Sequence, residues 1–263
     1  MNDIFLSLIL GLVQGLTEFL PISSSAHLLL PSLVFGSGDL GLSFDIAVHA
    51  GTLMAVIYFF KSEIILMAKS VFTTEENFSQ HRKLTLYLII ATIPIIFAGL
   101  TFSSLIEQRI FSISNIAYTN LFFAGILFFA FMYRKENKGI FEISIYGALI
   151  IGIIQCFAII PGASRSGMAI TAALLIGMNL KDASKFAFML GIPTILGALV
   201  FLIIDSQMSG TTYNFLNLVI GFFVSMFFAF FTIKFFLNFV ERIGMIPFVI
   251  YRIFLGIILL FLI

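Results

Sequence analysis

Residues 11–27 read GLVQGLTEFLPISSSAH, and residues 152–166 read GIIQCFAIIPGASRS. Both stretches run from Gly-x-x-Gln to a proline and then to serines, and both interrupt short apolar segments. Only 14 charge-free residues lead from residue 4 up to Glu18, and 15 follow Arg165, whereas a membrane-spanning helix needs about 20 residues. Because a proline ends or kinks a helix, we expect two re-entrant hairpins of half-helices, at residues 4–35 and 143–178.

The composition around these stretches is that of a membrane protein. Apolar residues make up 60% of the 263 residues and charged residues 10%, against roughly 45–50% and about 25% in soluble domains. This excludes a soluble globular protein, and the formal charge of +1 gives no basic footprint for nucleic acid. The fold class that we expect is an all-α polytopic membrane protein. Its six transmembrane helices are predicted at the other charge-free runs, about 42–60, 84–106, 116–133, 186–204, 215–237 and 245–263.

The basic residues predict how the chain is oriented across the membrane. If the six spans alternate and each hairpin returns to the side it entered, eleven of the 14 Lys and Arg fall in loops on one side. The positive-inside rule makes that side cytoplasmic and places both termini outside the cell. On the other side a loop holds Arg109, while Arg165 and Arg252 lie within segments.

The similarity of residues 11–27 to residues 152–166 also predicts an internal repeat within one membrane domain, 1–263. Residues 1–133 form the first copy, and residues 140–263 form the second, each with one hairpin and three spans. Three spans between the hairpins give the copies opposite orientations. Inverted repeats with broken helices place polar sites at the bilayer midplane, and we expect the site to open toward the extracytoplasmic face.

Two charges are expected deepest in the membrane, Glu18 and Arg165. Each costs about 2.5–3.5 kcal/mol at a helix centre, so each needs compensation. One interpretation is a structural ion pair between the hairpins, and the other is a functional site. Gln14 lies four residues before Glu18 and therefore shares its helix face, which favours the functional site.

The serines after each proline favour an anion site. Helix starts offer free backbone N–H groups, and an Arg fork holds two oxygens of a phosphate at once. N-capping alone explains one serine but not a run of them. We expect phosphate to be bound by residues of both turns and by Gln14. The turn residues are Ser23, Ser25, Gly162, Ser164 and Ser166.

Two histidines lie near these groups. His27 is three residues beyond Ser24 on the same helix face, where it could move protons near pH 7 or be a hydrogen-bonded structural residue. Asp45 and His49 are four residues apart at the start of the next span, and we expect them to orient the site. Gly11 and Gly15 form a GxxxG spacing that indicates close helix packing.

In these motifs the sequence resembles the undecaprenyl-diphosphate phosphatase family, which confers bacitracin resistance. The Pro-Gly-x-Ser-Arg-Ser-Gly element at 161–167 is specific, and the motifs follow the family's order over nearly the whole chain. The matching pieces are Gln14-x-x-x-Glu18 with the residues 19–27, Phe44-Asp45 through His49 to Leu53, residues 161–167, and Phe186 through Pro193 to Ala198.

The resemblance implies a membrane hydrolase that converts undecaprenyl diphosphate to undecaprenyl phosphate and recycles the carrier for peptidoglycan synthesis. Bacitracin would then be linked to it only through the shared substrate, and a homodimer is a candidate assembly. The resemblance also implies a divalent cation, Mg²⁺ or Ca²⁺, with Glu18 as ligand. The catalytic residues implied are Glu18, Ser24, His27 and Arg165. Many members carry a Glu where this chain has Gln14.

Two questions stay open on sequence alone. The nucleophile is Ser24 activated by His27, or water activated by Glu18 or His27. A lipid-phosphate flippase or secondary transporter with the same inverted repeat is the alternative function. A structural scaffold conflicts with the cost of burying Glu18 and Arg165.

Overall fold

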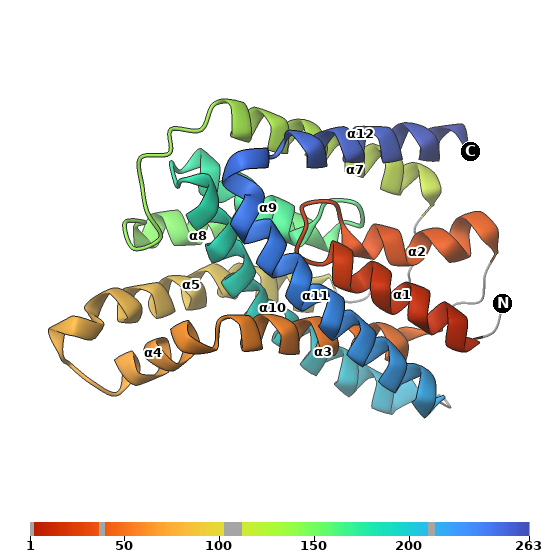
Figure 1. The fold of residues 1–263 in the computed structure, drawn as a ribbon, viewed down its shortest axis with the longest axis horizontal. Coiled ribbons are helices and arrows are strands. Elements are labelled where there is room, and N and C mark those ends of the chain that lie inside the picture. The colour runs from red at the N-terminus through yellow and green to blue at the C-terminus, as the bar shows by residue number, and fades with distance from the viewer. Residues whose placement is uncertain (1–2, 37–39, 103–111, 210–213, 263) are drawn as a thin grey trace.

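The computed structural model describes residues 3–36, 40–102, 112–209 and 214–262, which are almost entirely helical. Within these ranges the β-structure amounts to an isolated bridge between Lys138 and Met178. The helices are arranged as in Figure 1. They are α1 (Asp3–Thr17), α2 (Ser24–Phe35), α3 (Leu42–Phe59), α4 (Lys61–Val71), η1 (Glu76–Phe78), α5 (Ser79–Thr101), α7 (Ile113–Met132), α8 (Ile145–Gln155), η2 (Cys156–Ile159), α9 (Arg165–Leu175), α10 (Leu180–Ser209), α11 (Phe215–Ile243) and α12 (Ile246–Phe261).

Five stretches of the described chain are long and apolar enough to cross a membrane. They are Leu42–Phe59, Glu76–Thr101, Ile113–Met132, Leu180–Phe201 and Phe215–Ile243. The sixth predicted span, 245–263, is found as α12, which is apolar but has only 16 residues. The structure therefore supports a multi-pass membrane protein. The end of the predicted span 84–106, and Arg109 after it, lie outside the described residues.

Both predicted helix breaks are present. α1 ends before Glu18, and α2 starts at Ser24, while α8 and η2 are followed by a turn that leads into α9. The residue before each new helix has the left-handed conformation, with φ of 71° at Ser23 and 74° at Ser164. Such values are uncommon outside glycine and are concentrated at functional sites. The two turns therefore share an unusual backbone feature as well as a sequence pattern.

Four elements differ from the sequence expectation. α5 begins at Ser79 and α10 at Leu180, so the basic residues 82, 83, 181 and 185, which were expected in loops, lie in helices. Residues 61–83 were expected to form a loop, but α4 occupies Lys61–Val71, because a short helix with charged residues on one face gives no spanning signal. α11 continues to Ile243, so Lys234 and Arg242 lie in its last third and not in a loop. Both side chains are exposed.

Glycines set the closest helix crossings. Gly11 and Gly15 of α1 pack against α11, which confirms the packing role predicted from their spacing. Gly51 of α3 also packs on α11, and Gly152 of α8 packs on the backbone of α5 at Ala91. In membranes helices associate through such small residues, because backbones can then approach closely.

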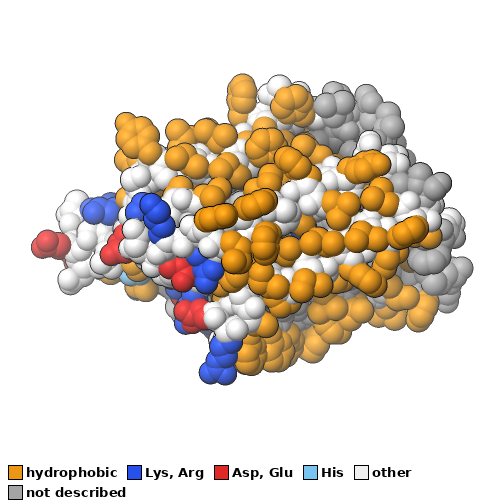
Figure 2. Space-filling model, turned by 90° about the horizontal axis from the view of Figure 1, so that it is seen from above, with side chains coloured by type: hydrophobic (Ala, Val, Ile, Leu, Met, Phe, Trp, Pro, Cys, Tyr) orange, Lys and Arg blue, Asp and Glu red, His pale blue; other side chains and the backbone are white. Residues whose placement is uncertain are grey.

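The surface separates charge from apolar area. Figure 2 shows hydrophobic side chains over most of one face, with Lys, Arg, Asp and Glu gathered at one end. This is the end at which α4 lies, and both termini lie at the opposite end (Figure 1). Among the described residues the charged end holds three ion pairs, Arg134–Glu136, Lys181–Glu241 and Lys185–Glu63.

Candidate active site

The two turns bring together the two charges that were expected deepest. Arg165 is the first residue of α9, and its Nη2 donates to Oε1 of Glu18 at 2.9 Å. The side chains are only 14% and 5% exposed. The charges therefore compensate each other, as required of buried ionic groups.

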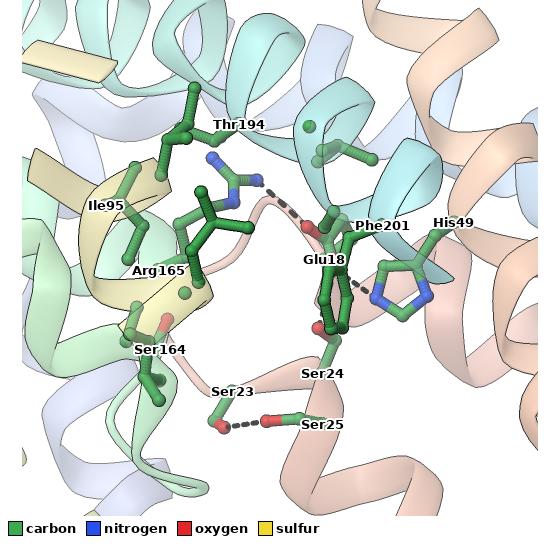
Figure 3. A pocket seen from close by; sticks show the side chains of 18 residues that line it. Glu18, Ser23, Ser24, Ser25, His49, Ile95, Ser164, Arg165, Thr194 and Phe201 are labelled. Atoms are coloured by element: carbon green, nitrogen blue, oxygen red, sulfur yellow. Dashed lines mark hydrogen bonds and ion pairs between the residues drawn. The ribbon is translucent and has the colours of Figure 1, made fainter. Parts of the chain in front are cut away.

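The second carboxylate oxygen of Glu18 has three other groups around it, of which Figure 3 draws Ser24 and His49. The Ser24 hydroxyl donates to Oε2 at 2.6 Å, and Nε2 of Gln14 donates to it at 3.0 Å. Nε2 of His49 lies 3.8 Å from the same oxygen. A hydroxyl that donates to a buried carboxylate has the geometry of a nucleophile beside its base.

A cavity of about 360 Å³ opens beside this cluster. Its polar lining residues come from the two turns, from α3 and from Thr194 of α10. Its apolar lining residues come from α5, η2 and α10, and Figure 3 labels Ile95 and Phe201 among them. A cavity of this size and character is typical of a site for an amphiphilic small molecule.

The predicted phosphate-binding residues divide into two groups. Ser23, Ser25 and Ser164 line the cavity, whereas Gln14, Gly162 and Ser166 do not. Ser164 caps α9 by accepting from the N–H of Gly167 at 3.1 Å. The Ser166 hydroxyl donates to the Leu20 carbonyl at 2.9 Å, so it joins the two turns.

The two histidines have different surroundings. In His27, Nδ1 lies 2.7 Å from the Ser23 carbonyl, and Nε2 lies 2.6 Å from the Tyr251 hydroxyl. The His27 and Tyr251 rings stack with centroids 5.7 Å apart, and His27 does not line the cavity. His49 does line it, and its Nδ1 lies 2.7 Å from the Asp45 carbonyl oxygen. The structure thus brings His49, and not His27, to Glu18.

Residues 7–258 of the chain match the family described as bacitracin resistance protein BacA. The chain belongs to the BacA family. It is 42% identical over 261 residues to an undecaprenyl-diphosphatase of Alcanivorax borkumensis, with 98% of each chain covered. Its identity is 43% to proteins of the same description from Saccharophagus degradans, over 97% of this chain and 96% of the relative, and from Teredinibacter turnerae, over 98% of each.

One further residue of this BacA-family site was not predicted from the sequence. Gly191 of α10 faces the Arg165 guanidinium, and a Cβ at Gly191 would lie 2.6 Å from Arg165 Nη1. Arg165 Nη1 also donates to the Ala187 carbonyl at 3.4 Å. The signal available in the sequence was a glycine in the interior of a long helix, two residues before Pro193, where alanine would favour the helix.

The donor set limits which cation this BacA-family site could hold. Among the described residues no group of three or more His, Cys, Asp or Glu could hold a metal ion. Beside the Glu18 carboxylate, Oε1 of Gln14 is buried without a hydrogen-bond partner in the described chain. One carboxylate and one amide oxygen fit a hard cation such as Mg²⁺, whose other ligands are waters and substrate phosphate oxygens.

Proposed function

We propose that this protein is an integral-membrane phosphatase that hydrolyses undecaprenyl diphosphate to undecaprenyl phosphate and phosphate. The observation that carries the proposal is the Glu18 carboxylate, which pairs with Arg165 through one oxygen and accepts from Ser24 through the other. The identity to undecaprenyl-diphosphatases over nearly the full length supports the substrate. The reaction would recycle the lipid carrier for peptidoglycan synthesis and thereby give bacitracin resistance.

The diphosphate would bind at the polar side of the cavity. Nε of Arg165 is buried and has no hydrogen-bond partner in the described chain, so it offers a donor to a phosphate oxygen. The N-termini of α2 and α9 add backbone N–H groups and partial positive charge. The Ser23, Ser25 and Ser164 hydroxyls complete the set of donors.

The prenyl chain would follow the apolar lining. The apolar residues that line the cavity include Ile95 and Leu100 of α5, and Ile195 and Phe201 of α10. Because about 360 Å³ is too small for a long polyprenyl chain, most of that chain would lie outside the cavity, in the lipid.

For the chemical step, the Ser24 hydroxyl is the nucleophile that the hydrogen bonds favour. Its oxygen would attack the terminal phosphorus, the bridging P–O bond would break, and the electron pair would leave on undecaprenyl phosphate. Glu18 would take the Ser24 proton and pass it to the leaving phosphate. Water would then attack the phosphoserine, with Glu18 taking its proton and returning it to Ser24. Arg165 and the helix N-termini would stabilise the charge on the transferred phosphoryl group.

His27 stays a predicted catalytic residue. Nε2 of His27 lies at the Tyr251 hydroxyl, whereas the Ser24 hydroxyl donates directly to Glu18. Glu18 is therefore better placed than His27 to take the Ser24 proton.

We also propose a divalent cation, Mg²⁺ or Ca²⁺, held by Glu18 and Oε1 of Gln14 together with substrate oxygens. When bound it would neutralise charge on the diphosphate. Dialysis against EDTA is expected to lower phosphate release at least tenfold, and added Mg²⁺ or Ca²⁺ is expected to restore it. Full activity after chelation, with metal analysis showing none retained, would contradict this part.

The proposed arrangement in the bacterial inner membrane is an inverted repeat with re-entrant hairpins. The matching left-handed residues, Ser23 and Ser164, support the repeat. The separation of the charged end from both termini supports termini outside the cell (Figures 1 and 2). The cavity is lined by the C-terminal parts of α5 and α10, which begin at the charged end, so it would open toward the extracytoplasmic side.

The function is tested by inorganic phosphate released from undecaprenyl diphosphate in detergent, where transport has no second compartment. Steady release that falls at least a thousandfold in Glu18→Ala is expected, because that variant removes the proton acceptor and the Arg165 partner. With substrate labelled in the terminal phosphate, rapid quenching should trap label on the wild type and none on Ser24→Ala.

No release from folded wild-type protein would instead favour a lipid-phosphate transporter. Release without trapped label would favour water as the nucleophile. The same preparation, run by light scattering in detergent, would show whether the candidate homodimer forms.

A further inference from the structure

Arg252 of α12 is a buried charge that the proposed chemistry does not use. Its side chain is 0% exposed, and within the described ranges it forms no ion pair with a carboxylate. Its guanidinium donates to main-chain carbonyls instead. Nη1 donates to Pro21 at 3.3 Å and to Ala163 at 3.2 Å, and Nη2 donates to Gly162 at 2.6 Å.

These three carbonyls belong to the two turns of the site. Pro21 lies two residues before Ser23, and Gly162 and Ala163 come directly before Ser164. The serines are the left-handed residues from which α2 and α9 start. A single planar guanidinium therefore holds the starts of both half-helices, and its fixed fork sets the distance between them.

Asn120 also holds Arg252 in this place. Asn120 of α7 is fully buried, accepts from Arg252 Nε at 2.8 Å and donates to the Arg252 carbonyl at 2.7 Å. Gly167, in the first turn of α9, lies next to the guanidinium, and a Cβ there would be 3.4 Å from Arg252 Nη1, an ordinary van der Waals contact. The position of Arg252 is thus defined by Asn120 of α7 as well as by the carbonyls of the two turns.

The charge of Arg252 matters as well as its hydrogen bonds. Glu18 and Arg165 cancel each other, whereas Arg252 has only carbonyl and amide partners in the described chain. A buried charge without a counter-ion is costly, and its field is screened little in a low-dielectric interior. A diphosphate, which is multiply negative, would supply the missing counter-charge.

We propose that Arg252 is a positioning residue of the phosphate site, which fixes the spacing of the two half-helix N-termini and gives the site its net positive charge. The inference rests on the proposed hydrolysis for its substrate. The spacing role and the charge role can be tested separately. Lysine at position 252 keeps the charge but loses the planar guanidinium, whereas glutamine loses the charge but keeps an amide donor.

The test compares Arg252→Lys and Arg252→Gln in detergent, with kcat and KM for undecaprenyl diphosphate and Ki for inorganic pyrophosphate. Arg252→Gln is expected to raise KM and Ki at least tenfold, which corresponds to about 1.4 kcal/mol. Arg252→Lys is expected to keep Ki within about threefold of wild type but to lower kcat, since an ammonium cannot match the fork. Equal Ki values in the two variants, or a wild-type Ki in Arg252→Gln, would overturn the proposal.

Asn120→Ala keeps the test decisive if the Arg252 variants do not fold. It retains the Arg252 charge and removes its anchor on α7, so kcat should fall while Ki for pyrophosphate stays unchanged. A wild-type kcat in this variant would overturn the positioning role. If the wild type released no phosphate, the proposed hydrolysis would fail. The charge of Arg252 could still be tested by thermal melts with pyrophosphate, which should stabilise the wild type but not Arg252→Gln.

Discussion

Gly191 shows how a missing side chain can place a functional one. The Arg165 guanidinium lies against this glycine, in space that a Cβ would occupy. Because the clash involves the far end of a flexible side chain, Gly191→Ala should leave folding nearly intact. It should nevertheless move the guanidinium away from Glu18, to which Nη2 donates at 2.9 Å.

We therefore expect Gly191→Ala to lower kcat/KM by about 10- to 100-fold, the cost of a misplacement near 1 Å. Phosphate release and a thermal melt in detergent measure the two effects separately. Gly125→Ala in α7 is the control, since nothing lies within 4 Å of its added Cβ and the residue does not line the cavity. Equal activity of the two variants would show that Gly191 does not position Arg165.

The surroundings of single residues were only partly predictable. Gln14 and Glu18 are on one helix face, so their contact followed from helical spacing alone. Helical spacing did not predict which histidine, His27 or His49, lies next to Glu18. That depends on the rotation of α2 and on Tyr251, which is 224 positions further along the chain. The sequence shows Arg252 as a charge within an apolar segment, but it does not show its carbonyl partners, which come from two distant turns.

At the scale of elements, the crossing of α3 and α11 decides where His49 lies. Gly51 follows His49 by two residues, and a Cβ at Gly51 would overlap the Phe222 carbonyl oxygen and Ser225 Oγ. The Ser225 hydroxyl donates to the Val48 carbonyl at 2.9 Å, which joins the same two helices. The backbone atoms of α11 cannot move aside as a side chain could.

Gly51→Ala is expected to force α3 and α11 apart and to destabilise the protein by about 1–3 kcal/mol, the usual cost of overpacking. Reduced phosphate release should accompany the lower melting temperature, since His49 and the cavity wall move with α3. Gly125→Ala in α7 is the control, because nothing lies within 4 Å of its added Cβ. An unchanged melting temperature for Gly51→Ala would contradict the close contact between α3 and α11 at Gly51.

The helices and helix breaks could be predicted from the sequence where the apolar runs and their interruptions were clear. The two breaks were predictable because proline and serine interrupt apolar runs that are too short to span. α4 was missed because charged residues in a short helix resemble a loop, and the end of α11 was missed because its last third carries Lys234 and Arg242.

At the scale of the whole molecule, the charged end and the termini lie at opposite ends (Figure 1). Labelling of single cysteines in a Cys156→Ala background tests which end faces the cytoplasm. An impermeant maleimide should label Leu262→Cys in intact spheroplasts and Glu75→Cys only after permeabilisation, because both positions are exposed at opposite ends. The reverse pattern would contradict the proposed orientation.

The size of the cavity has a consequence for the kinetics. A site that holds the head of the substrate and leaves most of its tail in lipid meets that substrate by lateral diffusion within the membrane. The quantity that sets the rate is then the mole fraction of lipid diphosphate in the bilayer or micelle, and not its bulk concentration. Adding inert detergent at constant substrate and enzyme should therefore slow turnover by surface dilution.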